Sequence, residues 1–371
     1  MNYYKTPIIF CPSIEDGGVE KNLYLISNYL SDKLNKLTLI SANVDKRNRF
    51  AKKIKFVAPQ KNFINSTRRI KALICIFLII KEFIFKKKDF AILCFQANIY
   101  AIIFCYIFKK KIIVRSNTSP SGWSNSFFKN KLFSFFFNKA NLVIVNSSEF
   151  KKEIKKKLNI KSKLIYNPLN YSEIKLKSKE KVKLNFYKYN TTNFISVGRL
   201  TDQKDHMTLL KAIKIIKREL LKPKIKVIII GKGAKFNLLN LFIKNNKLEN
   251  LVKLIGYKKN PYPYIRKSDC FILSSIYEGL PNVLLEAMSL DKYIISSNCP
   301  TGPHEILKEN KYKNFFKIKN HNQLAELMIN FSQSKKNYSI KNIRDSYQKI
   351  LYKFNYKINC EKYYKYFKKI L

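Results

Sequence analysis

Short apolar strands alternate with longer amphipathic stretches along the first half of the chain, and this alternation limits the fold more than any other feature. The expected strands cover residues 7–11, 37–42, 54–57, 90–95, 112–115 and 142–146. The expected helices cover residues 19–30, 66–85, 99–108, 124–138 and 148–158. Because parallel strands need crossover connections, the alternation is typical of βαβ units, in which helices cover both faces of a parallel sheet.

The same alternation occurs a second time after a break. Residues 171–192 are polar and lysine-rich, which predicts a linker. Strands are then expected at 193–197, 226–230, 251–255, 270–273, 293–296 and 314–318, and helices at 206–221, 235–245, 261–267, 281–289 and 323–334. We therefore predict an α/β chain with two tandem Rossmann-like, doubly wound domains, at residues 1–170 and 193–340, and a helical tail at 341–371. The 371 residues suit two domains.

The charge of the chain indicates an anionic partner. The sequence has 73 Lys and Arg residues against 24 Asp and Glu residues, a formal net charge of +49. A phospholipid surface, a nucleic acid or a diphosphate substrate would each suit this excess, and charge alone does not choose among them. The seven cysteines are scattered without a CxxC pair, which predicts reduced thiols in a cytosolic protein.

Two segments bear on membranes. The first eleven residues lack the layout of a signal peptide. Residues 90–108 are mostly apolar and nearly long enough to cross a bilayer, but Gln96 and Asn98 interrupt them. We therefore expect a buried strand followed by a hydrophobic helix there, with a membrane span as the alternative.

Glycines follow several of the expected strands. Gly17 and Gly18 come after the first strand, Gly198 follows the first strand of the second domain, and Gly231 and Gly233 follow the next. Glycine at the carboxyl end of a parallel strand lets a ligand approach the backbone, and the next helix N-terminus attracts anions. Each motif is weak by itself, because glycine also ends strands. The sequence contains neither a full GxGxxG nor a Walker A motif, so a dehydrogenase or P-loop enzyme is not supported.

The strongest motif lies at residues 274–288, SSIYEGLPNVLLEAM. Glu278 stands in the turn after a strand, Pro281 suits the first position of a helix, and Glu286 follows on that helix. The neighbours of Glu286 are apolar, so its carboxylate is costly to bury without a partner. A ribose diol would supply two hydroxyl donors.

This segment resembles the E-x7-E signature of the retaining glycosyltransferases of family 4. Residues 17–20 resemble the N-terminal glycine loop of that family, and residues 197–200, with Lys204 and Asp205, resemble its diphosphate-binding stretch. Further matches in the same order are at residues 231–233, 256–257 and 298–307. The resemblance covers roughly residues 7–307 and implies the GT-B fold, in which two Rossmann-like domains face each other across a cleft.

The resemblance also implies roles for residues that bind the donor. Arg199 and Lys204 would clamp the diphosphate of a nucleotide sugar, and the amides of Asn282 and Val283 would add to that clamp. Glu286 would hold the ribose, and Glu278 would contact hydroxyls of the transferred sugar. The glycines implied in donor binding are Gly17, Gly18, Gly198, Gly231 and Gly233.

The acceptor side departs from the family pattern. Asn117 or a neighbour stands where many relatives carry a histidine or an acidic residue, and His304 stands where relatives often carry arginine. We treat both as acceptor-side candidates, with a purely structural role as the alternative for His304. Without a protein base, the departing phosphate can itself take the proton of the acceptor on the same face of the sugar. No DxD motif stands in a suitable place, so we expect no required cofactor or metal.

The resemblance thus implies a retaining glycosyltransferase that moves a hexosyl or N-acetylhexosaminyl group from a nucleotide sugar, expected to be UDP-linked. The acceptor it implies is a lipid-linked glycan, a polysaccharide or a lipopolysaccharide. Lysine runs at residues 86–88, 109–111 and 151–163, interleaved with aromatic residues, suggest peripheral docking on the anionic cytoplasmic face of the plasma membrane. The alternatives are a nucleotide-sugar epimerase or phosphorylase on the same architecture, or a nucleic-acid-binding protein. A nucleic-acid-binding protein would need a recognition motif and arginines placed for base contacts, and the sequence shows neither. No nucleic-acid partner is therefore expected.

Overall fold

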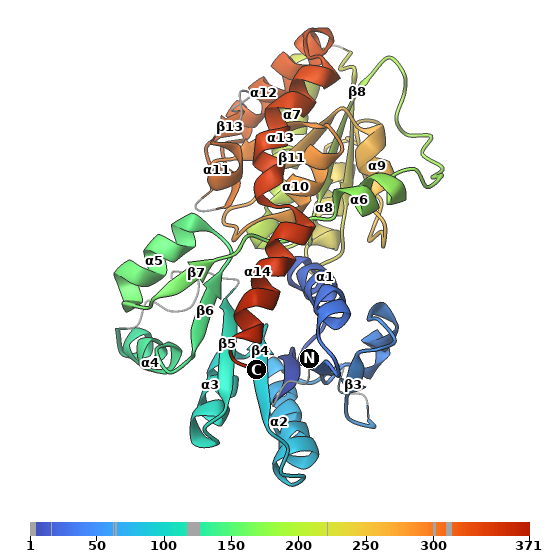
Figure 1. The fold of residues 1–371 in the computed structure, drawn as a ribbon. Coiled ribbons are helices and arrows are strands. Elements are labelled where there is room, and N and C mark those ends of the chain that lie inside the picture. Colours follow the sequence, from blue (N-terminus) through green and yellow to red (C-terminus); the bar gives the residue numbers. More distant parts are fainter. Residues whose placement is uncertain are drawn as a thin grey trace. The chain divides into compact units, whose positions relative to one another are not determined.

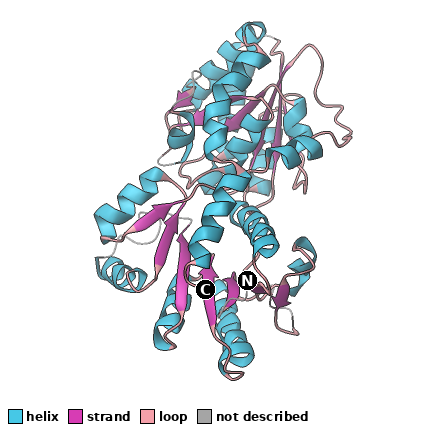
Figure 2. Cartoon of the chain, viewed as in Figure 1, coloured by secondary structure: helices cyan, strands magenta, loops and turns pink. Residues whose placement is uncertain are grey.

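The computed structural model describes residues 5–15, 17–61, 63, 65–116, 127–220, 222–299, 302–308 and 314–371. It divides into two compact units (Figure 1). The first unit consists of Met1–Pro168 and Tyr356–Leu371, and the second of Leu169–Asn355. Each unit contains a parallel sheet covered by helices, as the colouring by secondary structure shows (Figure 2).

The sheet of the first unit has seven parallel strands in the order β3-β2-β1-β4-β5-β6-β7. Its strands are β1 (Thr6–Phe10), β2 (Thr38–Ile40), β3 (Lys55–Val57), β4 (Phe90–Cys94), β5 (Lys111–Ser116), β6 (Leu142–Val145) and β7 (Ser162–Leu164). The central strands are mostly apolar because both faces of the sheet are covered by helices. Sequence patterning missed β7, a short strand with few apolar residues.

The two faces of this sheet have separate cores. Core residues of one face come from α2 (Arg68–Ile79), the π-helical turn η2 (Ile80–Ile84), α3 (Asn98–Ile107), α4 (Phe127–Phe137) and α5 (Ser148–Leu158). Those of the other face come from α1 (Gly18–Lys33) and α14 (Tyr356–Lys368), which pack against each other. The 3-10 turn η1 (Val44–Arg49) follows β2.

A buried arginine joins the end of the chain to this sheet. Arg115, at the end of β5, is 0% exposed. Its Nε donates to the hydroxyl of Tyr363 in α14 at 2.9 Å, and its Nη2 donates to Asn167 Oδ1 at 2.6 Å. A buried guanidinium must be hydrogen-bonded, so these contacts tie α14 to the first unit.

The sheet of the second unit has six parallel strands in the order β10-β9-β8-β11-β12-β13. The strands are β8 (Thr192–Val197), β9 (Ile225–Ile230), β10 (Val252–Leu254), β11 (Cys270–Leu273), β12 (Tyr293–Ser297) and β13 (Phe315–Phe316). The helices are α6 (Tyr171–Lys177), α7 (His206–Glu219), α8 (Phe236–Asn245), α9 (Tyr262–Lys267), α10 (Asn282–Ser289), α11 (Gly302–Leu307), α12 (His321–Ser334) and α13 (Ile340–Lys353), with 3-10 turns η4 (Asp202–Lys204) and η5 (Lys335–Asn337).

The predicted fold class of two parallel-sheet, Rossmann-like domains is confirmed. The apolar segment 90–108 is strand β4 followed by helix α3, as expected from Gln96 and Asn98. Within the described ranges, every helix is too short or too polar to cross a bilayer. The tail differs from the single helix expected: it breaks after Lys353 into α13, which lies in the second unit, and α14, which lies in the first. Residues 171–192, expected as a linker, begin with the short helix α6.

Candidate active site

The candidate site of the second unit forms where two neighbouring strands end. β8 and β11 pair in parallel, with Phe194 opposite Cys270 and Ile195 opposite Phe271. Their carboxyl ends therefore meet at one edge of the sheet, and the loops that follow them lie side by side. The loop after β8 carries Arg199 and Lys204, and the loop after β11 carries Glu278.

An ion pair joins these loops. Lys204 Nζ lies against Glu278 Oε1, and the two side chains are only 14% and 7% exposed. The hydroxyl of Ser275 donates a second hydrogen bond to the same carboxylate oxygen at 2.6 Å. Lys204 and Glu278, to which the sequence assigned different roles, are thus in direct contact. Sequence reasoning did not identify Ser275, although it belongs to the same motif.

Gln203 holds the two loops together and was also missed by sequence reasoning. Its Nε2 donates to the carbonyl of Tyr277 at 3.1 Å, and its own carbonyl accepts from the amide of Ile276 at 2.8 Å. Its Oε1 accepts from Arg199 Nη2 at 3.3 Å, which orients an otherwise exposed guanidinium. A glutamine one residue before a predicted phosphate-binding lysine gives no distinctive signal in one sequence.

The glycines of the second unit allow backbone segments to pack against one another. A Cβ on Gly231 would lie 1.8 Å from the carbonyl oxygen of Gly198, and one on Gly233 would lie 2.4 Å from that of Leu200. The amide of Gly198 donates to Ile230 and that of Leu200 to Lys232, at 2.9 and 3.0 Å. These two glycines therefore set the path of the loop that carries Arg199.

A buried histidine lies beneath the same loop. His206 is 3% exposed, and its Nδ1 lies 3.4 Å from Ser196 Oγ. Burial, reinforced by the charge of Lys204, lowers the pKa of His206 to about 4, so the ring is neutral at pH 7. Asp205 precedes it in the left-handed conformation (φ 44°) and caps α7 by accepting from the amide of Thr208 at 3.3 Å. Sequence reasoning placed His206 at the start of a helix but assigned it no role.

Glu286 is buried, as expected, but it has a protein partner. Glu286 lies on α10 and is only 2% exposed. Burial raises the pKa of Tyr262, and the charges of Glu286 and Glu173 and a hydrogen bond to the Glu286 side chain raise it further. The tyrosine hydroxyl from α9 thus lies against this carboxylate. Burial of Glu286 therefore does not by itself require a ligand hydroxyl, which the sequence could not reveal.

The remaining predicted residues of the second unit lie on short helices. Asn282 and Val283 are the first two residues of α10 and are partly exposed. The positive end of the helix dipole lies there, which suits an anion. His304 is exposed on α11, with its ring centroid 6.2 Å from that of Phe315.

In the first unit, Gly17 caps the N-terminus of α1 in an extended conformation, and Gly18 begins the helix. A Cβ on Gly17 would lie 2.8 Å from Glu20 Oε2. Glu20 is buried and accepts from Gln96 Nε2 at 3.3 Å, and burial raises the pKa of its carboxyl. Asn117 lies outside the described residues.

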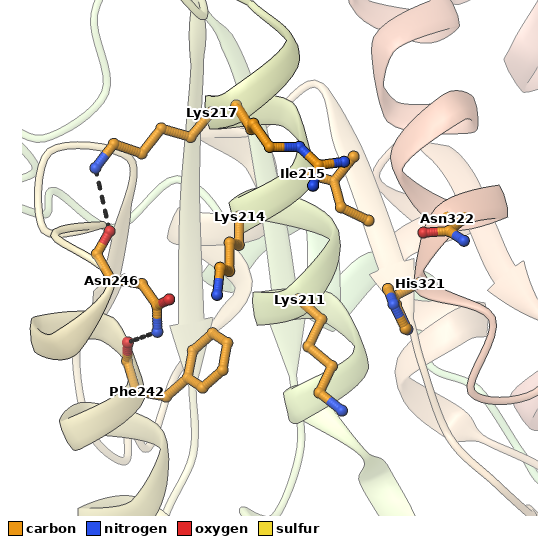
Figure 3. Close-up of a pocket in the computed structure, with 9 residues that line it drawn as sticks. Lys211, Lys214, Ile215, Lys217, Phe242, Asn246, His321 and Asn322 are labelled. Carbon is orange, nitrogen blue, oxygen red and sulfur yellow. Dashed lines mark hydrogen bonds between the residues drawn. The ribbon is translucent and has the colours of Figure 1, made fainter.

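A separate open groove of about 590 Å³ lies over the outer side of α7 (Figure 3). It is lined by Lys211, Lys214, Ile215, Lys217, Arg218, Phe242, Asn246, His321 and Asn322. Lys217 Nζ donates to the carbonyl of Asn246 at 3.1 Å. Among the described residues that line the groove, none is a predicted donor-binding residue, so this groove is not the candidate site.

The candidate site suits an anionic ligand that carries hydroxyl groups. Arg199 and Lys204 are hydrogen-bond-donating cations, and the start of α10 adds a positive dipole end. Glu278 and Glu286 are hydroxyl acceptors. Among the described residues, no group of three or more His, Cys, Asp or Glu side chains is placed to hold a metal ion.

Residues 177–346 match the protein family described as "Glycosyl transferases group 1". An uncharacterized glycosyltransferase of Methanocaldococcus jannaschii is 37% identical over 181 residues, 47% of this chain and 44% of that protein. An N-acetylgalactosamine-N,N'-diacetylbacillosaminyl-diphospho-undecaprenol 4-alpha-N-acetylgalactosaminyltransferase of Campylobacter jejuni is 27% identical over 226 residues, 59% of each chain. The chain spans about half the length of the curated relatives it matches.

Solved structures match nearly the whole chain. Anabaena HepE in complex with UDP and glucose has a TM-score of 0.77 and 16% identity, covering 98% of this chain and 100% of that one. A glycosyltransferase from Rickettsia africae has a TM-score of 0.75 and 19% identity, covering 99% of each chain. Residues 177–346 therefore carry the match to glycosyl transferases group 1, on a chain with the GT-B fold of solved glycosyltransferases.

Proposed function

We propose that the chain is a retaining glycosyltransferase that moves a hexosyl or N-acetylhexosaminyl group from a nucleotide diphosphate sugar to a lipid-linked or glycan acceptor. The observation that carries this proposal is the cluster of Arg199, Lys204 and Glu278 at the paired ends of β8 and β11. These residues lie inside the segment that matches the glycosyl transferases group 1. Two cations near a hydroxyl-accepting carboxylate suit a sugar joined to a diphosphate.

A UDP-linked donor is the substrate we propose. The similar fold of HepE has been solved with UDP and glucose, which supports this choice. Glu286 would accept hydrogen bonds from the ribose hydroxyls, sharing its carboxylate with the hydroxyl of Tyr262. The amides of Asn282 and Val283 at the start of α10 would contact the diphosphate.

The proposed reaction breaks the bond between the anomeric carbon and the diphosphate oxygen. The acceptor oxygen forms its bond on the same face of the sugar, and its proton passes to the departing phosphate. Negative charge grows on the diphosphate as this happens, so Arg199 and Lys204 stabilise the transition state more than the bound donor. Glu278 contacts hydroxyls of the transferred sugar and also holds Lys204 in place. This mechanism uses no metal ion or other cofactor.

The acceptor side rests on the relatives. The Campylobacter jejuni relative is named for a diphospho-undecaprenol acceptor. Two further relatives are named for diphosphoundecaprenol- or PP-undecaprenol-linked acceptors. We infer that this chain likewise works on a lipid-linked glycan, docked peripherally at the cytoplasmic face of the membrane. His304 would face the acceptor or its phosphate, and Asn117 remains a candidate on the acceptor side.

A screen of sugar nucleotides against undecaprenyl-diphosphate glycans tests the proposal. We expect UDP release that depends on acceptor, and a product whose new linkage keeps the α configuration of the donor in the anomeric coupling measured by NMR. An inverted linkage would refute the retaining mechanism. Interconversion of the sugar nucleotide without transfer would indicate an epimerase, and salt-sensitive binding of any polynucleotide in place of sugar nucleotides would indicate a nucleic-acid-binding protein.

A further inference from the structure

We propose that the outer surface of α2, α3 and α4 in the first unit inserts into an anionic lipid bilayer. The proposal rests on the proposed function only in so far as a lipid-linked acceptor would lie in such a bilayer. We call this surface the docking face. It consists of Leu73 and Phe77 on α2, Tyr106 and Ile107 on α3, and Leu132 and Phe135 on α4.

The six side chains of the docking face are exposed although they are large and apolar. Their exposed fractions are 57% for Leu73, 61% for Phe77, 56% for Tyr106, 64% for Ile107, 53% for Leu132 and 53% for Phe135. Contiguous exposed apolar surface on a folded protein marks an interaction site, whereas single exposed apolar residues are ordinary.

The six residues form one surface because their helices are neighbours on the same face of the sheet. α2 packs against α3, and α3 packs against α4. Lys139 Nζ lies 5.2 Å from the ring centroid of Tyr106 and 5.1 Å from that of Phe135, so these rings on α3 and α4 share one cation. The core residues of these three helices lie on the opposite face of the sheet from those of α1 and α14. Figure 1 shows α2, α3 and α4 in the first unit.

The apolar residues of this surface do not belong to a core. The inner sides of the same helices already bury Cys75 and Ile79 of α2, Ala101 and Cys105 of α3, and Phe137 of α4 against the sheet. α2 and α3 are therefore apolar on both sides. A helix that is apolar on all sides is normally buried on all sides. The outer sides of α2 and α3 are exposed instead, and insertion into a bilayer would bury them.

The charge around the docking face selects an anionic bilayer as the partner. Residues 68–111 contain nine basic residues that are not buried, Arg68, Arg69, Lys81, Lys86, Lys87, Lys88, Lys109, Lys110 and Lys111, against two acidic ones, Glu82 and Asp89. The tenth basic residue of the segment, Lys71, is buried and does not contribute to this surface charge. Both acids are already paired, Glu82 with Lys55 and Lys86, and Asp89 with Lys110. An apolar protein partner would not need this excess of lysine, and a neutral membrane would not attract it.

Lysines and aromatic rings alternate at one end of the docking face. Phe85 is 74% exposed beside the exposed Lys86, Lys87 and Lys88, and Phe108 is 36% exposed beside Lys109. Lysine side chains can lie along apolar surface and place their ammonium groups at lipid phosphates, while aromatic rings occupy the boundary between headgroups and acyl chains. This arrangement suits shallow insertion, without a span.

Helix α5 supplies a matched control. It carries the exposed lysines Lys151, Lys152, Lys155 and Lys156, but its apolar residues Phe150, Ile154 and Leu158 are buried. α5 therefore offers positive charge without apolar side chains. Its lysines should add long-range attraction to an anionic surface but no insertion.

The experiment measures binding of the whole chain to vesicles of phosphatidylglycerol and phosphatidylcholine, and to vesicles of phosphatidylcholine alone. For the wild-type chain we expect binding that needs phosphatidylglycerol and weakens with salt but keeps a fraction at 0.5 M salt. F77S/I107S should lose that salt-resistant fraction and weaken binding at least tenfold at low salt. K87E/K109E should also weaken low-salt binding at least tenfold, and the α5 control K152E/K156E should weaken it less than threefold.

Three outcomes would overturn the proposal. The first is wild-type binding by F77S/I107S, and the second is equal binding to vesicles with and without phosphatidylglycerol. The third is a wild-type dimer that F77S/I107S converts to a monomer, which would make the face a contact between copies of the chain. UDP binding, measured for every variant without vesicles, should stay unchanged. Loss of vesicle binding with intact UDP binding separates failure of docking from failure of the proposed transferase function.

Discussion

Lys204 and Glu278 form an ion pair between the loops that follow β8 and β11, 74 residues apart in the chain. The pair is largely shielded from water, and Ser275 donates a second hydrogen bond to the carboxylate. Removing one partner from such a pair leaves the other charge buried and costs far more than removing both. The two residues we assign to the diphosphate and to the transferred sugar therefore also stabilise the loops that hold them.

For this reason Lys204→Ala should impair both folding and catalysis. We expect the free energy of unfolding to fall by about 3 kcal/mol, because the Glu278 carboxylate stays buried without its partner. The double variant K204A/E278Q should regain part of that stability while turnover stays low. Denaturant unfolding with steady-state kinetics measures both effects, and additive losses of stability in the double variant would contradict this coupling.

Arg199→Ala should impair catalysis alone. Arg199 is exposed, and its described hydrogen bond to Gln203 is long at 3.3 Å, so stability should change by less than about 0.5 kcal/mol. Loss of a cation that stabilises the leaving diphosphate should cost about 2 kcal/mol, close to a 30-fold fall in kcat. Arg218→Ala, an exposed arginine on α7, is the control and should retain full turnover. Near-normal kcat in Arg199→Ala would show that Arg199 does not belong to the catalytic site.

Glu286→Gln tests the ribose assignment. An amide accepts hydrogen bonds less strongly than a carboxylate, so we expect a higher KM for the donor and equally weaker binding of UDP, measured by calorimetry. Tyr262→Phe removes the protein hydroxyl beside Glu286 and should affect UDP binding less. Unchanged UDP affinity together with lowered stability in Glu286→Gln would instead make Glu286 a structural residue of α10.

Gly231→Ala and Gly256→Ala should differ sharply in stability. The new methyl group of the first would lie 1.8 Å from the Gly198 carbonyl oxygen, which forces the backbone apart, so we expect a loss of about 3 kcal/mol or more. Gly256 has open space around it but a φ of +70°, so alanine there should cost only about 1 kcal/mol. Urea unfolding compares the two, and equal losses would show that the contact at Gly231 relaxes freely.

His206 should make the second unit sensitive to acid. The folded chain binds a proton at His206 only near pH 4, whereas an unfolded histidine does so near pH 6.5. The contribution of neutral His206 to the free energy of unfolding is thus complete above pH 6.5 and is lost as the pH falls toward 4. When the pH falls from 7 to 5, we expect this residue to lower the free energy of unfolding by about 2 kcal/mol. Urea unfolding at the two pH values measures it, and His206→Gln should show a smaller difference than the wild-type chain.

Local patterning was enough to predict the strands of both sheets except the short edge strand β7. The central strands are covered on both faces, so they are apolar runs that end at glycine or polar residues, and the helices between them keep their own period. Gln96 and Asn98 were sufficient to divide the apolar segment at β4 and α3. Glycines and carboxylates at strand ends also indicated the candidate site, because parallel strands bring those ends to one edge.

Contacts between distant residues were decided by tertiary structure alone. The pairing of Lys204 with Glu278 and of Tyr262 with Glu286 depends on which loops adjoin, and one sequence does not encode that in any local period. The same holds for α14, which packs on α1 in the first unit and whose Tyr363 meets the buried Arg115, 248 residues away. The exposure of Phe77 also depends on tertiary structure. The apolar sequence of α2 is typical of a buried helix, but α2 packs on the sheet through Cys75 and Ile79, and Phe77 on its opposite side is left exposed to solvent.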